Sequence, residues 1–137
     1  MTADLAIFPP PAAAGRSAAV EARHLHPAAL TRWRALLGLR WQERLEMATE
    51  FSVAYHDARE AAADASSGPD ARCAARRRAS AALHCAVSER IALGEIEAAL
   101  ARLAAGRFGW CEQCAAAITA ARLTETPHAR CCPECER

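Results

Sequence analysis

The chain has 137 residues, and alanine, which buries little surface, fills 37 of them, so the composition argues against a thick β-sandwich or a doubly wound core. All 17 basic residues are arginine, and 16 acidic residues leave a formal net charge of +1, too little to attract nucleic acid or anionic lipid strongly. The sequence has no run of 18 apolar residues and no basic n-region, so we expect a cytoplasmic protein with reduced thiols.

Residues 1–27 are rich in alanine and proline and offer almost nothing to bury, which predicts a disordered tail. Residues 28–64 contain no proline, and large apolar side chains recur there every three or four residues. This pattern predicts a long helix over 28–64. A second proline-free stretch predicts another helix over 70–105. Between them, small residues with Gly68 and Pro69 predict a turn.

Two long helices joined by a short connection pack antiparallel, so residues 28–105 are predicted to form a coiled-coil hairpin with its tip near 65–72. Positions along both helices follow the spacing of a coiled-coil seam. We expect these seam residues to be buried between the helices or against the next segment: Leu45, Phe51, Ile91, Ile96 and Leu100. The alanine-rich tip offers less area to bury, so we expect the helices to fray there first.

Residues 106–137 carry five of the seven cysteines and are predicted to form a small separate lobe at the open end of the hairpin. Two CxxC pairs lie 17 residues apart, a spacing typical of a zinc finger. The predicted ligands of one structural Zn²⁺ are Cys111, Cys114, Cys132 and Cys135. A closed site of four thiolates has no position for a reacting water, so the zinc is not expected to be catalytic. The fold class is therefore mainly α: a long hairpin with a C4 zinc-finger lobe.

Two neighbouring residues leave alternatives open for the second pair of ligands. Cys131 directly precedes Cys132 and could replace it, although Cys131 and Cys135 would then form the less usual CxxxC spacing. We expect Cys131 to be a free thiol beside the site. His128 lies four residues before Cys132 and is a weaker candidate.

The finger motif resembles that of the DksA/TraR family of zinc-finger transcription regulators. The resemblance rests on Gly106-Arg107-Phe108-Gly109-Trp110-Cys111, Cys114, Ile118, Arg122-Leu123, Pro127, Cys132 and Cys135, with the hairpin in the matching position. It implies a monomeric, non-enzymatic protein that binds RNA polymerase directly, inserts its coiled-coil tip through the secondary channel and does not recognise a DNA sequence. The weak net charge agrees with a protein partner.

The tip departs from the family pattern. Two acidic residues and an alanine are common at the family's tip, and their positions fall on Gly68, Ala71 and Cys73. The candidate partner-binding residues here are one acid and four arginines: Asp70, Arg72, Arg76, Arg77 and Arg78. A solvated arginine face is the alternative interpretation.

Other positions also differ from the family. Members that respond to ppGpp place basic residues near positions that correspond to Glu95, Thr126 and Glu136, so we expect no response to ppGpp. Ala115 stands where the family often has glycine after the first CxxC, and longer members have a C-terminal helix with no counterpart after Cys135.

The alternative function is a zinc-stabilised protein-interaction module without polymerase activity. A nucleic-acid-binding zinc ribbon and an enzyme are less favoured, because the finger has no net charge and the sequence shows no catalytic set.

Overall fold

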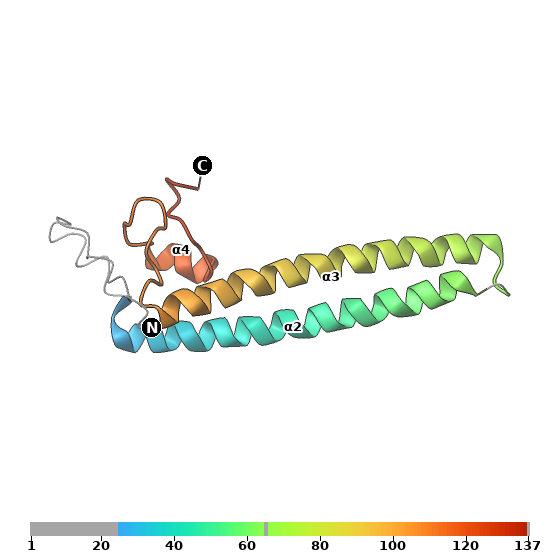
Figure 1. Ribbon diagram of the computed structural model, residues 1–137, viewed down its shortest axis with the longest axis horizontal. Coiled ribbons are helices and arrows are strands. Elements are labelled where there is room, and N and C mark those ends of the chain that lie inside the picture. The colour runs from blue at the N-terminus through green and yellow to red at the C-terminus, as the bar shows by residue number, and fades with distance from the viewer. Residues whose placement is uncertain (1–24, 65, 137) are drawn as a thin grey trace, which may run out of the picture.

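Two long antiparallel helices with a small lobe at one end make up the part of the chain that the structure, a computed structural model, describes: residues 25–64 and 66–136 (Figure 1). The helices are α2 (Pro27–Ala63), α3 (Pro69–Ala104) and the short α4 (Ala120–Glu125). The predicted hairpin with a terminal lobe is confirmed. Most of the predicted tail, residues 1–24, lies outside the described residues. None of the described helices combines the length and the apolar composition that a membrane span requires.

Each long helix begins at a proline, which lacks the backbone N–H that would have no partner there. Pro27 follows His26, and Pro69 follows Gly68 with an extended backbone at the cap position. At the other end of α2, the backbone N–H of Asp64 still bonds to the carbonyl of Glu60 and closes the last turn. The connection between the helices is therefore short, and it keeps them antiparallel and in contact along their length.

The seam of the hairpin divides into two halves of different composition. Near the finger, α3 buries Leu93, Ile96 and Leu103, and α2 buries Leu37. Towards the tip the buried residues of both helices are alanines: Ala48, Ala58, Ala75, Ala79 and Ala86. Because a methyl group buries far less area than a leucine side chain, most of the hydrophobic stabilisation lies in the half next to the finger.

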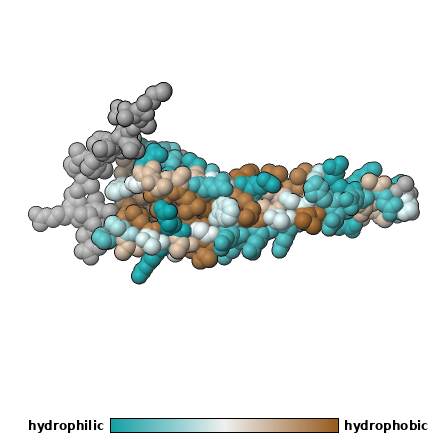
Figure 2. Space-filling model, turned by 60° about the horizontal axis from the view of Figure 1, so that its bottom comes forward, coloured by the Kyte–Doolittle hydropathy of each residue, from teal (hydrophilic) through white to brown (hydrophobic). Residues whose placement is uncertain are grey.

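Large apolar side chains in the middle of the hairpin face solvent instead of the seam. Leu83, Val87 and Ile91 of α3 are 44%, 48% and 65% exposed. Figure 2 shows apolar surface along the outside of the hairpin, in agreement with these exposures. In its middle part, helix α3 thus has large aliphatic residues on an outer ridge, while alanines such as Ala79 and Ala86 lie in the seam.

The predicted burial of the seam residues is confirmed for Ile96, and Phe51 and Leu100 are half-buried. The prediction is wrong for Leu45 and Ile91, which are exposed. Arg44, one position before Leu45, lies at the seam, where it forms an ion pair of 2.9 Å with Glu89. Glu89 is buried, so the seam contains a charged pair at positions near Leu45 and Ile91, which the spacing of apolar residues predicted to be buried. Leu45 is consequently rotated outward and is 41% exposed.

Candidate metal centre and hairpin tip

The finger starts where α3 ends in a turn that requires a left-handed residue. Gly106 has φ of 68°, and its N–H bonds to the carbonyl of Leu103, while the N–H of Arg107 bonds to the carbonyl of Arg102. This is the Schellman arrangement, in which glycine avoids the strain of a Cβ atom. It ends the helix and turns the chain towards the first CxxC pair.

The first CxxC pair lies in a tight turn between two short extended segments. Trp110 and Ala117 form an antiparallel bridge, and the N–H of Cys111 bonds to the carbonyl of Ala116 at 2.8 Å. Ala115 has φ of 56°, and no other non-glycine residue in the described part of the chain has a positive φ. The turn therefore has the backbone conformation for which glycine is the usual residue, and alanine adopts it at a cost.

The second CxxC pair is held against a small apolar core. Helix α4 is capped by Thr119, whose hydroxyl oxygen accepts a hydrogen bond from the N–H of Arg122, and the helix buries Leu123 completely. Ile118 is also fully buried, and Phe108 contributes a ring 6.0 Å from that of Trp33 on α2. The finger thus packs on the base of the hairpin, and the turn from Cys132 to Cys135 follows this core.

The four predicted ligands come together at one point. The sulfur atoms of Cys111, Cys114, Cys132 and Cys135 all lie within 4.8 Å of one another, and Cys114 Sγ is 3.8 Å from Cys132 Sγ. Four sulfur atoms at Zn–S distances of about 2.3 Å in a tetrahedron are separated by about 3.8 Å. The donor set and its dimensions therefore fit one tetrahedral zinc ion, as predicted.

The backbone around the cluster favours an ionised sulfur at its buried member. Burial of the Cys111 thiol opposes ionisation, but backbone N–H groups of Cys114, Cys132 and Gln113 point at its sulfur and lower its pKa to about 6. Hydrogen bonds with Cys132 and Cys114 raise the pKa of Cys135 to about 12. Without a cation the four thiols therefore do not ionise together, whereas a bound metal compensates their charge.

The alternative ligands lie next to this group but outside it. Neither Cys131 nor His128 belongs to the set of converging donor atoms found in the described part of the chain. Burial raises the pKa of the Cys131 thiol, and the charge of the nearby Cys111 raises it further. Burial also lowers the pKa of His128, whose backbone carbonyl accepts a hydrogen bond from Arg102.

A charged network that the sequence analysis missed joins the finger to α3. Arg130 Nε donates to Glu95 at 2.9 Å, and Arg130 Nη1 lies 3.7 Å from Glu112. Arg102 Nη1 lies 3.5 Å from the same Glu112 carboxylate, and Arg102 is 7% exposed. In the sequence these residues look like ordinary surface charges. The sequence around Arg102 carries no local signal that it faces inward.

The candidate tip residues lie at the opposite end of the hairpin from the cysteines, about 50 Å away by the length of α3 (Figure 1). Asp70 is in the first turn of α3, Arg72 is half-buried, and the arginines at 76, 77 and 78 are exposed. The structure therefore brings the four cysteines together and keeps the tip residues apart from them.

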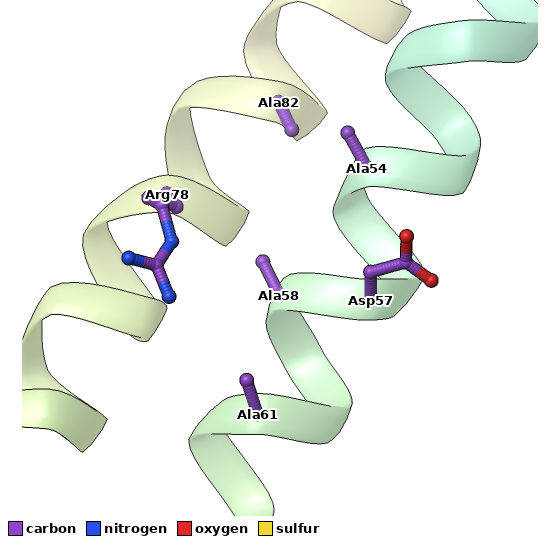
Figure 3. Close-up of a pocket in the computed structure, with 6 residues that line it drawn as sticks. All are labelled: Ala54, Asp57, Ala58, Ala61, Arg78 and Ala82. Atoms are coloured by element: carbon purple, nitrogen blue, oxygen red, sulfur yellow. The ribbon is translucent and has the colours of Figure 1, made fainter.

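The tip arginines have no ion-pair partner among the described residues. Arg77 Nη1 lies 3.4 Å from the sulfur of Cys73. Arg78 lines one side of a shallow groove floored by alanines, and Asp57 lies on its other side (Figure 3). The positive charge of the tip is therefore available to a partner.

A hydrogen-bonded carboxylate closes the tip. Asp64 accepts from the backbone N–H of Ser66 at 2.9 Å, from the Ser66 hydroxyl at 2.7 Å and from the Ser67 hydroxyl at 3.2 Å. These bonds, with that of the Ser66 side chain the strongest, lower the pKa of Asp64. The acid on the α2 side of the turn is thus occupied in the turn itself.

The fold of the hairpin and its terminal lobe is similar to that of a known transcription factor. The solved structure of DksA2 from Pseudomonas aeruginosa matches with a TM-score of 0.67 and 24% sequence identity, over 88% of this chain and 92% of that chain. The chain has the DksA fold. This match and the cysteine cluster confirm the resemblance that the motif predicted. No protein-family model and no curated protein matches the chain.

In this fold the two candidate sites lie at opposite ends of the hairpin (Figure 1). The finger lies at the base, where the seam is rich in leucine and isoleucine, and the tip is carried on the alanine half. The metal centre is thus placed to stabilise the base of the hairpin, and it lies far from any partner that contacts the tip.

Proposed function

We propose that the chain is a non-enzymatic, zinc-stabilised transcription regulator of the DksA/TraR family that binds RNA polymerase in the cytoplasm. The observation that carries this proposal is the match to the transcription factor DksA2 over nearly the whole of both chains, with the converging cysteines at the base of the hairpin. In this proposal the chain acts as a monomer, its tip enters the secondary channel of the polymerase, and it recognises no DNA sequence.

The shape of the hairpin supports entry into a channel. Two helices alone form a rod only two helix diameters wide, and the small seam residues Ala58, Ala75 and Ala79 let them approach closely at the tip. In this proposal the unpaired arginines at 76, 77 and 78, about two turns behind Asp70 on α3, follow the turn towards the catalytic centre. Guanidinium groups bind carboxylates and phosphates in bidentate geometry, and both groups are present in a polymerase.

The pocket at the junction of the hairpin and the finger supports independence from ppGpp. The three positions that the family resemblance associates with this nucleotide, Glu95, Thr126 and Glu136, all line this pocket of about 580 Å³. Glu95 is paired with Arg130, and Glu136 with Arg122. The pocket therefore presents two paired carboxylates where a polyphosphate would need free cations. This arrangement disfavours the binding of a polyphosphate.

The test of the proposal is binding of the purified full chain to core RNA polymerase. We expect weak to moderate binding that is unchanged by ppGpp, and weaker binding when the arginines at 76, 77 and 78 are replaced together by alanine. The matched control replaces three exposed arginines at the base of α2 by alanine: Arg32, Arg34 and Arg40. Absence of binding by the wild-type chain would refute the proposal.

The second candidate function is a protein-interaction module that has kept the scaffold without acting on transcription. The observation that favours it is the tip itself, where Gly68, Ala71 and Cys73 occupy the positions of the family's common residues. The two functions differ in an initiation assay at matched polymerase occupancy. Binding without any change in transcription supports the interaction module.

A further inference from the structure

Arg102 is a buried cation in the last turn of α3, outside the finger. A buried guanidinium is stable only when its donors have partners. Arg102 Nη2 donates to the backbone carbonyls of His128 at 2.9 Å and Ala129 at 3.4 Å. Its Nη1 makes no hydrogen bond, but it lies 3.5 Å from the carboxylate of Glu112, within ion-pair distance. The side chain is therefore directed at the finger and held there from two directions.

The partners of Arg102 belong to both halves of the cysteine cluster. Glu112 lies inside the first CxxC pair, directly after Cys111. The carbonyls of His128 and Ala129 lie on the segment that leads to Cys132. One guanidinium thus contacts both chain segments that supply the sulfur atoms. The backbone adds a parallel link, because the N–H of Glu112 donates to the carbonyl of Arg130 at 2.9 Å.

We propose that Arg102 is a positioning residue for the metal centre, which holds the two CxxC turns at the separation that zinc requires and couples zinc binding to the end of α3. Arginine suits this role because its planar fork presents donors in two directions, whereas lysine offers a single ammonium group. Four thiolates around Zn²⁺ leave a net negative charge, and the nearby guanidinium partly neutralises it.

A second link gives the coupling its direction along the helix. Glu95 lies about two turns before Arg102 on α3, and it accepts from Arg130 Nε at 2.9 Å. The segment before the second CxxC pair is therefore tied to α3 at two points, through Arg102 and through Arg130. If ordering of this segment by zinc stabilises the end of α3, thermodynamic linkage requires that the ordered helix end raises zinc affinity equally.

The test compares zinc affinity of the full chain by competition with a chromophoric chelator. Substitutions behind metal ligands typically cost about 10- to 100-fold in metal affinity, and we expect a loss of this size in Arg102→Met. Arg102→Lys should fall between Arg102→Met and wild type. The matched control is Arg90→Met, an exposed arginine on the same helix, with affinity unchanged. Equal affinity of Arg102→Met and wild type would overturn the proposal.

A second measurement needs no variant, so it holds even if Arg102→Met fails to fold. Amide hydrogen exchange of the wild-type full chain is recorded with zinc bound and after removal of zinc by a chelator. We expect amides 98–104 to lose protection when zinc leaves, while amides 79–86 in the alanine half keep theirs. Unchanged protection at 98–104 would show that zinc and the helix end are independent, which would overturn the coupling.

Discussion

Arg44 and Glu89, 45 positions apart in the chain, form an ion pair inside the seam of the hairpin, where one nitrogen of Arg44 donates to both Glu89 oxygens at 3.1 and 2.9 Å. Glu89 is 8% exposed, and its partner side chain keeps 44% of its surface in water. The pair lies between the leucine-rich and the alanine-rich halves of the seam. Such a pair fixes the register of two helices more than it adds stability.

The unequal burial of the pair predicts unequal costs for breaking it. Arg44→Leu leaves a buried carboxylate without a cation and should lower the free energy of unfolding by about 2 kcal/mol. Glu89→Leu should cost less, because Arg44 can turn its head group to water. The double variant Arg44→Leu/Glu89→Leu should be as stable as wild type or more stable. Denaturant unfolding with zinc bound measures all three.

The matched control for this series is Arg40→Leu, which breaks the exposed pair of Arg40 with Glu43 and should change stability by less than about 0.5 kcal/mol. If the double variant loses as much as the two single variants together, the two residues act independently. The seam pair would then have no role in register.

The backbone of Ala115 predicts a stabilising substitution in the first CxxC turn. With φ of 56°, Ala115 bears the strain of a left-handed residue with a side chain, which Ala115→Gly removes. After the extra entropy of glycine in the unfolded chain is subtracted, we expect a gain of about 1 kcal/mol. Ala116→Gly is the matched control and should be destabilising. Thermal unfolding of the zinc-bound chain compares them, and a loss in Ala115→Gly would contradict the argument from φ.

Metal analysis tests the assignment of the ligands. The buried apolar residues of the finger, Phe108, Ile118 and Leu123, are too few to order the lobe alone, so metal binding should supply part of its folding free energy. We expect one zinc per chain after purification without chelator, and loss of both zinc and finger structure in Cys114→Ala or Cys135→Ala. Elemental analysis and near-ultraviolet circular dichroism follow the two losses.

The choice between the adjacent cysteines has its own pair of variants. Cys132→Ser should release zinc, and Cys131→Ser should keep it, because the sulfur of Cys132 is in the converging group and that of Cys131 is not. The opposite result would make Cys131 the ligand. Retention of zinc in both variants would mean that the two thiols replace each other.

Much of this fold follows from features that survive without tertiary context. Long proline-free stretches predict long helices, the cluster at Gly68 and Pro69 predicts the turn, and the CxxC pairs predict the metal centre. The seam was harder to predict, because alanine carries little hydrophobic signal. Periodicity is dominated by the large residues Leu83, Val87 and Ile91, which lie on the outer ridge.

Charged residues that become buried are equally hard to recognise. Glu89 and Arg102 look like solvated positions on long helices, and their burial depends on partners that lie 45 and 26 residues away. Pairing between segments distant in the chain leaves no local periodic signal. The sequence therefore predicts where the metal binds, whereas the residues that hold the two halves of the site together emerge only from the packed structure.

The alanine seam predicts that the hairpin opens from its tip. Since the alanines at 58, 75 and 79 bury little area, local opening there should cost less free energy than near the finger. Hydrogen exchange should be fastest at residues 62–75 and slowest near Ile96. Uniformly slow exchange along both helices would contradict this gradient.

Asp64 should limit this opening at the turn. Its lowered pKa means that the charged carboxylate stabilises the turn above the ordinary carboxyl pKa, and that this stabilisation is lost as the pH falls through the lowered value. Asp64→Ala should therefore speed the exchange of Ser66 at neutral pH. Asp57→Ala, on the same helix outside the turn, is the matched control. Equal exchange rates of the Ser66 amide in both variants would show that Asp64 does not stabilise the turn.

The chemistry of the tip decides between a regulator and an interaction module. An acidic tip can perturb the metal of a polymerase active site, whereas arginines pair with carboxylates or phosphates. Asp70 is exposed, and it is the carboxylate nearest to the turn on the α3 side. We therefore expect that Asp70→Asn changes transcription less than replacement of Arg76, Arg77 and Arg78 together by alanine.

The measurement is an in vitro initiation assay in which the concentration of each variant is adjusted to equal polymerase occupancy. Equal occupancy separates an effect at the active centre from a loss of binding, since the arginines at 76, 77 and 78 contribute to both in the proposed function. A large effect of Asp70→Asn alone would mean that an acidic mechanism operates from a position shifted by one residue. No effect of either change, with binding intact, would assign the hairpin to protein interaction instead of transcription control.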